Sequence, residues 1–174
     1  PKFEAVREDF DVYLGDQAIA RLDNSYVTTE LGLGYAIGRL GYLKAAGGYA
    51  ATRTDIAIGS PLFPSQSSSS TYGSITAKVD TLDNVGFPRH GSFLDAEYVF
   101  FQKSLGSAEQ RSAYVVNFLQ PLSWGANTVH LAGRFGRATQ DGTFRLGGIF
   151  NLSGTPFGQV AGSEVAFARA MYYR

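Results

Sequence analysis

The chain has 174 residues, of which 44% are hydrophobic and only 17% are charged, below the roughly 25% expected of a soluble domain. With 15 basic and 15 acidic residues it lacks the basic excess of a nucleic-acid-binding protein, so no nucleic-acid partner is expected. Cysteine is absent, which excludes a disulfide framework and a thiolate metal site. The 21 Gly, 10 Tyr and 13 Phe fit a membrane β-barrel, or a soluble all-β barrel or sandwich.

Neither a run of about 18 apolar residues nor a signal peptide is present, so no transmembrane helix is predicted. A membrane barrel must first cross the inner membrane, so we expect the chain to be a mature protein or an excerpt of a longer one. Its last residues, Tyr173 and Arg174, also favour an excerpt, because complete outer-membrane barrels generally end on Phe or Trp.

Alternation of apolar and polar residues predicts the strands of the first half. In chain order we expect a strand at 3–14, a polar connection through 15–25, a strand at 26–37, a tight turn at 38–41, a strand from 42 to about 58, a polar loop through the serine run 67–70, and a strand from 73.

The second half continues the pattern. We expect a tight turn at 83–91, a strand at 92–103, a polar loop at 104–110, a strand around 114–118, a short turn at 123–127, a strand at 129–135 and a last strand at 163–173. This makes about eight strands of about 10–12 residues without a helix, joined by alternately long and short connections, as in membrane barrels.

The glycine-rich stretch from Phe144 to Gly154 fits poorly as a strand, because adjacent glycines weaken a ladder and Pro156 breaks one. We predict a long loop, about residues 139–162, that folds back into the barrel. The fold class predicted is therefore an all-β, antiparallel transmembrane β-barrel, a single domain over residues 1–174, with a loop folded into its lumen.

Polar side chains alternate with apolar ones on several predicted strands, which assigns them to the lumen. They are Asp95, Glu97, Asn117, His130 and Arg134. For Asp95 and Glu97 we expect pairing with Arg134 or Arg145 rather than acid–base catalysis.

Catalytic, cofactor-binding and metal-binding residues are not predicted. The two histidines, without cysteine, make a poor zinc set. No serine lies in G-x-S-x-G, and no phosphate-loop motif accompanies Gly147 and Gly148. We therefore expect neither a cofactor nor enzyme activity in this segment.

Two motifs carry a resemblance. The turn with Asp83, Asn84, Phe87, Pro88 and Gly91 resembles the "DN…FPxxG" turn of the bacterial surface antigen superfamily, the outer-membrane assembly and two-partner-secretion transporters. The stretch with Phe144, Arg145, Gly147, Gly148, Leu152, Ser153 and Gly154 resembles that family's long sixth loop. Three predicted strands separate the motifs, as in the family. The resemblance thus implies the fifth to the twelfth strand of a sixteen-stranded barrel.

The resemblance departs at the loop signature, where Ser153 stands in place of the family's arginine and Thr155 in place of its aromatic residue. A serine there leaves only a neutral hydrogen bond where the family has a charge-assisted contact. The sequence is similar to the variant found in barrels that follow a patatin-like phospholipase domain. The resemblance implies that such a hydrolase domain lies upstream.

The function expected is an outer-membrane barrel that serves as a translocation pore or membrane anchor for a passenger or substrate protein. Its partners are then the lipid bilayer and that protein, and an oligomer is compatible with the sequence. Two alternatives stay open: a complete small outer-membrane barrel with an adhesin or structural role, and a soluble barrel that binds an apolar ligand. In the soluble barrel Leu94, Tyr98, Phe100 and Val116 would line a cavity.

Overall fold

The computed structural model describes all residues except 15–16, 60–64, 141–142, 148–154 and 156–159. In this part of the chain the regular secondary structure consists of β-strands and one short 3₁₀ turn, Lys103–Leu105. The strands are β1 (Lys2–Leu14), β2 (Gln17–Ile37), β3 (Gly41–Gly59), β4 (Gln66–Asp80), β5 (Phe93–Phe101), β6 (Arg111–Trp124), β7 (Asn127–Ala138), β8 (Phe144–Leu146), β9 (Val160–Gly162) and β10 (Glu164–Tyr173).

Eight strands form one sheet in the order β1-β2-β3-β4-β5-β6-β7-β10, and all its pairs are antiparallel. The predicted all-β, antiparallel class is confirmed. The sheet is not closed into a barrel, because β1 and β10 are its edges and no described strand pairs with the free side of either. What the structure contains is an open wall.

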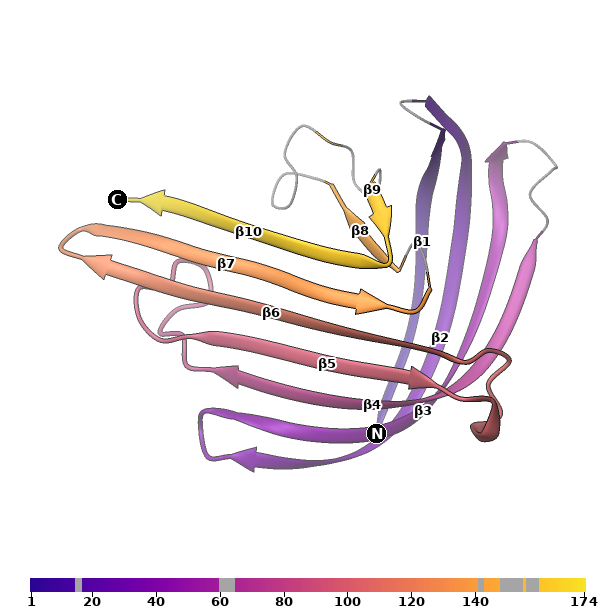
Figure 1. Ribbon diagram of the computed structural model, residues 1–174, viewed down its shortest axis with the longest axis horizontal. Coiled ribbons are helices and arrows are strands. Elements are labelled where there is room, and N and C mark those ends of the chain that lie inside the picture. The colour runs from indigo at the N-terminus through magenta and orange to yellow at the C-terminus, as the bar shows by residue number, and fades with distance from the viewer. Residues whose placement is uncertain (15–16, 60–64, 141–142, 148–154, 156–159) are drawn as a thin grey trace.

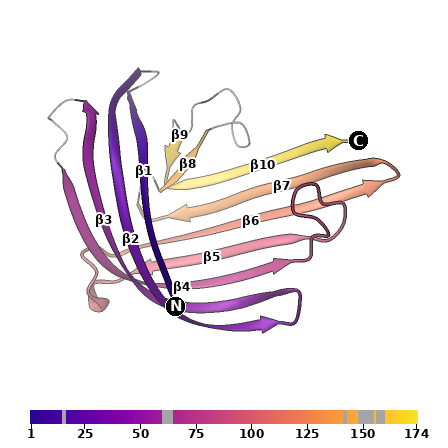
Figure 2. The same cartoon turned by 180° about the vertical axis from the view of Figure 1, so that it is seen from behind.

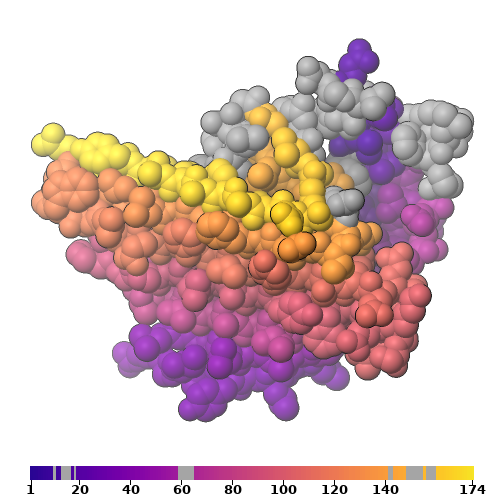
Figure 3. Space-filling view, in the orientation of Figure 1, coloured from indigo at the N-terminus to yellow at the C-terminus, as the bar shows by residue number. Residues whose placement is uncertain are grey.

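The wall is strongly curved, and β8 and β9 lie between its two edge strands in both views (Figure 1, Figure 2). These two strands pair only with each other and form a small antiparallel sheet inserted between β7 and β10. In the space-filling view β10 runs along one border of the visible surface, with β7, β6 and β5 following in sheet order (Figure 3).

The connections divide between the two ends of the wall. We call one end the turn end, where residues 38–40, 81–92 and 125–126 join strands, and the other the loop end, where 15–16, 60–65, 102–110 and 139–163 do so. The predicted alternation of short and long connections is wrong at two places. The first connection is only residues 15–16, and the connection at 81–92 is a folded segment rather than a tight turn.

Two predicted polar loops are wrong, because they are parts of strands. Residues 17–25 belong to β2, which is 21 residues long, and the serine run 67–70 belongs to β4. Their composition is typical of loops, but cross-strand partners supply a ladder that overrides local propensity. Asp23 pairs in register with Asp9 and Asp55, while Ser67 pairs with Arg53.

Candidate functional site: the inner face of the wall

Side chains of neighbouring residues in a strand point to opposite faces of a sheet, so the register assigns every residue to a face. We call the face that β8 covers the inner face and the opposite one the outer face. The inner face carries Glu30, Lys44, Tyr72, Thr76, Asp95, Glu97, Asn117, His130, Arg134 and Arg169. The outer face carries Leu31, Leu33, Tyr35, Ile75, Leu94, Tyr98, Val116, Phe135 and Tyr172.

Burial in this wall is the reverse of that in a soluble domain. On the outer face Leu31 is 72% exposed and Leu33 is 87% exposed. On the inner face Ser74 is 2%, Thr128 is 1% and His130 is 4% exposed. Fully buried polar residues are normally a minority in a folded protein, and large contiguous apolar patches are normally covered. The wall therefore shelters its polar face and exposes its apolar one.

The predicted lumen residues all lie on the inner face. Asp95, Asn117 and Arg134 are direct register partners across β5, β6 and β7, and Glu97 lies one inner-face position further along β5. No ion pair within 4.0 Å joins Arg134 to Asp95 or Glu97 in the described chain. The structure brings these residues together as a polar row rather than as an ion-paired cluster.

A second polar group, which the sequence did not single out, lies on the inner face of β2, β3 and β4. Lys44 Nζ lies 2.6 Å from Glu30 Oε1, and the Tyr72 hydroxyl donates to Glu30 Oε2 at 3.3 Å. Ser74 Oγ lies 3.5 Å from the same oxygen. A signal for this group exists in the sequence, because Glu30 and Lys44 are charged residues within glycine- and alanine-rich strands.

Two side chains of the DN motif, the Asp83 carboxylate and the Asn84 amide, organise the segment 81–92. Asp83 Oδ1 accepts backbone N–H groups of Arg89 at 2.9 Å and His90 at 3.2 Å. Asn84 Oδ1 accepts those of Gly86 and Phe87 at 2.8 and 3.1 Å. The two backbone hydrogen bonds, together with the His90 side chain, lower the pKa of Asp83 to about 2.

This segment also reaches across the inner face to the far edge of the wall. The carbonyl oxygen of Pro88 lies 2.6 Å from His130 Nε2 and accepts a hydrogen bond from the Tyr173 hydroxyl at 2.8 Å. A carbonyl can only accept, so Nε2 is the protonated nitrogen of His130 in this arrangement. The segment thereby connects the start of β5 with β7 and β10, and Phe87 packs edge-on against Tyr173 with ring centres 5.5 Å apart.

Of the predicted loop motif, the structure describes Phe144, Arg145 and Gly147. Gly148, Leu152, Ser153 and Gly154 lie outside the described residues. Phe144 is 6% exposed and packs against Ala138 and Val165 of the wall. The described part of the predicted loop therefore lies on the inner face.

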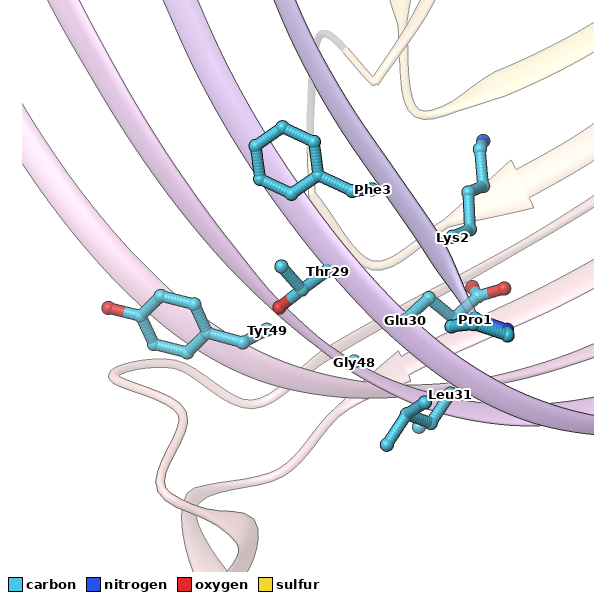
Figure 4. A pocket seen from close by; sticks show the side chains of 9 residues that line it. Pro1, Lys2, Phe3, Thr29, Glu30, Leu31, Gly48 and Tyr49 are labelled. Carbon is cyan, nitrogen blue, oxygen red and sulfur yellow. The ribbon is translucent and has the colours of Figure 1, made fainter.

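One open hollow at the β1 edge is lined from both faces of β1, β2 and β3. Phe3, Thr29 and Tyr49 lie on one side of the strands and Lys2 lies on the other (Figure 4).

The residues that the structure describes contain no group of three or more His, Cys, Asp or Glu side chains able to hold a metal ion. They also contain no helix long and apolar enough to cross a membrane.

The sequence matches no protein-family model. It also has no significant similarity to a curated protein.

Proposed function

We propose that this chain forms part of the wall of an outer-membrane β-barrel. In this barrel β8 and β9 belong to a loop folded into the lumen, and the barrel acts as a translocation pore or membrane anchor for a passenger or substrate protein. The resemblance to the bacterial surface antigen superfamily, in the variant that follows a patatin-like phospholipase domain, supports the same role. The chain itself then carries transport or anchoring rather than catalysis.

The single observation that carries the proposal is the inverted distribution of apolar and polar side chains. A bilayer covers apolar surface and tolerates no unpaired polar group, so a membrane barrel turns its apolar face outward. The outer face of this wall presents Leu33, Tyr35 and Ile75 more than half exposed. The ligand-binding soluble barrel requires the opposite, because its apolar residues would line the interior.

The apolar residues of the outer face form a band that stops before the loop end of the wall. Along β2 the outer-face residues are apolar from Ile37 to Leu31, and after Val27 they change to Ser25, Asp23 and Arg21. Ion pairs occupy this charged zone: Arg7 with Asp23 and Arg21 with Asp11 join β1 to β2, and Arg53 with Asp55 lies within β3. Such pairs belong in water, so β1, β2 and β3 extend beyond the hydrocarbon on this side.

An open wall has two edges that cannot remain unpaired in lipid. The proposed barrel therefore needs further strands beside β1 and β10, supplied by the rest of a longer chain or by another copy. A barrel of sixteen strands would contain this wall as half of its circumference.

A matched pair of arginine substitutions on β2 tests the proposal. Leu33→Arg places a charge on the outer face and Thr28→Arg places one on the inner face. In lipid the first costs about 2–4 kcal/mol near the bilayer centre, while the second faces the lumen and costs much less. In water Leu33→Arg costs almost nothing, because the leucine is already 87% exposed.

The measurement is the urea concentration that unfolds each full-length variant reconstituted in lipid vesicles. The proposal predicts a lower midpoint for Leu33→Arg than for Thr28→Arg. Equal midpoints, together with recovery of both variants from the aqueous fraction, would contradict it.

A further inference from the structure

β8 and β9 are attached to the wall by side chains rather than by a strand ladder. β8 pairs with β9 alone, through the three residue pairs Phe144↔Gly162, Arg145↔Ala161 and Leu146↔Val160. Among the described residues, backbone hydrogen bonds from Ala138 to Ser163 and from Thr139 to Ser112 lie where this insertion leaves the wall. Side-chain packing must therefore hold the small sheet against the inner face.

That packing centres on one aromatic ring. Phe144 is the largest buried side chain of the apolar cluster that joins β8 to β6, β7 and β10, and Leu146 of β8 and Phe167 of β10 pack against this cluster partly buried. It is 6% exposed, although it belongs to a three-residue strand, and its neighbours in the cluster include Ala138 and Val165.

The wall has a notch shaped for this ring at Gly136. A β carbon added to Gly136 would lie 2.6 Å from Phe144 Cζ and 2.7 Å from the Tyr114 carbonyl oxygen. Its backbone does not require glycine, because it is not among the glycines with positive φ. A glycine in a strand weakens it, so the covering ring gives a physical reason for its presence.

β7 offers an internal comparison on its outer face. There Gly133 is covered in the same way by Phe118, which belongs to the adjacent strand β6 and is fixed in the wall. Gly136 is covered by Phe144, which belongs to the insertion. Of these two aromatic–glycine contacts, only the second can separate while every strand of the wall keeps its partners.

A cation faces the same ring. The Arg134 guanidinium carbon lies 5.8 Å from the centre of the Phe144 ring, within the range of a cation–π interaction. Arg134 lies on the inner face two residues before Gly136, and its buried Nε has no hydrogen-bond acceptor in the described chain. The ring is thus held by a notch on one side and by a positive charge near its face.

We propose that Phe144 anchors β8 to the wall, seated in the Gly136 notch and held by Arg134, and that withdrawal of this ring uncovers the part of the inner face that β6 and β7 form beneath it. The inference rests on the proposed function and deepens it by naming the residues that keep the barrel closed. Arg134 and Gly136 are positioning residues here. The wall supplies the cation of this contact and the loop supplies the aromatic ring.

A cysteine reporter tests the anchor, because the chain contains no cysteine. Val115→Cys lies on the inner face beneath Phe144, while Thr52→Cys lies on the inner face of β3, away from β8. The rate of reaction with a charged methanethiosulfonate reagent is measured on the full-length protein in lipid vesicles. Adding Phe144→Ala should raise the rate at position 115 by about tenfold or more, since burial of the ring is lost, and leave position 52 unchanged.

Substitutions of the wall residues that contact Phe144 should also raise the reaction rate at position 115. Gly136→Ala places a methyl group where the ring sits and should raise the rate at position 115 as Phe144→Ala does. Gly34→Ala is its control, because the nearest atom to the added β carbon is an ordinary 3.4 Å away. Arg134→Gln should raise the rate about twofold to fivefold, and Arg134→Lys should raise it less, since a cation remains.

The outcomes separate the two proposals. If the unsubstituted protein fails to show heat-modifiable migration, the barrel itself is contradicted. If it shows that migration but neither Phe144→Ala nor Gly136→Ala changes the rate at position 115, the anchor alone is overturned. A higher rate in both variants, with Gly34→Ala unchanged, supports the anchor.

Discussion

Two elements occupy the inner face of the wall, and they are held in different ways. The segment 81–92 at the turn end is fixed by directional hydrogen bonds, from its own Asp83 and Asn84 and from His130 and Tyr173 of the wall. The pair β8–β9 at the loop end is held by apolar packing, in which Phe144 lies against Gly136 and Leu146 packs against the same cluster.

The difference shows which element belongs to the wall and which can leave it. Removing the segment 81–92 would leave the buried His130 and the half-buried Tyr173 without their Pro88 acceptor, and a buried unpaired group costs about 1–3 kcal/mol. Removing the ring of Phe144 exposes apolar surface but leaves no backbone group of the wall unpaired. We therefore expect the segment 81–92 to be permanent structure and the pair β8–β9 to be the movable part.

The largest effect expected at the turn end comes from Gly91→Val. Gly91 has φ of +90°, and a β carbon there would lie 2.5 Å from the carbonyl carbon of Thr81. Strain at such a position costs on the order of 3 kcal/mol. The variant should lower the urea midpoint of the barrel strongly. Gly86→Ala is the control, because its added methyl group meets nothing closer than 3.6 Å.

A smaller loss is expected when the buried histidine is replaced. His130→Phe keeps a ring on β7 but removes the donor to the Pro88 carbonyl, at a cost of about 1–3 kcal/mol. The comparison variant is His90→Phe at the other histidine, whose side chain is 76% exposed and which should cost less. Urea midpoints measured in the same vesicles compare the two. Equal losses would contradict a special role for the Pro88 contact.

The smallest effect expected depends on pH and on Asp83. Its pKa is lowered from 3.8 to about 2, so its carboxylate stabilises the folded turn fully above pH 3.8. That contribution should be lost as the pH falls from 3.8 through about 2. Protection of the Arg89 and His90 amides from hydrogen exchange should decline over this range. Asp83→Asn should remove the pH dependence, while the packing of Phe144 against Gly136, which involves no carboxylate, should show none.

The alternation of residues was sufficient to predict an antiparallel sheet, because polar and apolar residues alternate within the apolar band of β2, β4 and β7. The same pattern predicted loops wrongly where the strands extend beyond the apolar band. Residues 17–25 and the serines 67–70 have the composition of loops, and only their partners across the sheet make them strands. No local signal in β2 or β4 reports that such partners exist.

The candidate site was predictable in part for the same reason. The DN turn identified Asp83 and Pro88, but a motif cannot report that the Pro88 carbonyl meets residues 42 and 85 positions later in the chain. The contact between Gly136 and Phe144 could not be predicted from the sequence either. A glycine in a strand signals close approach, but only the fold shows that the approaching group is Phe144.

Contact of the outer face with lipid can be tested by heat-modifiable gel migration. The full-length protein would be extracted from outer membranes in mild detergent and run with and without boiling. If the wall belongs to a closed integral barrel, the protein should be found in the membrane fraction and its migration should shift on boiling. A protein in the soluble fraction with no shift would contradict it.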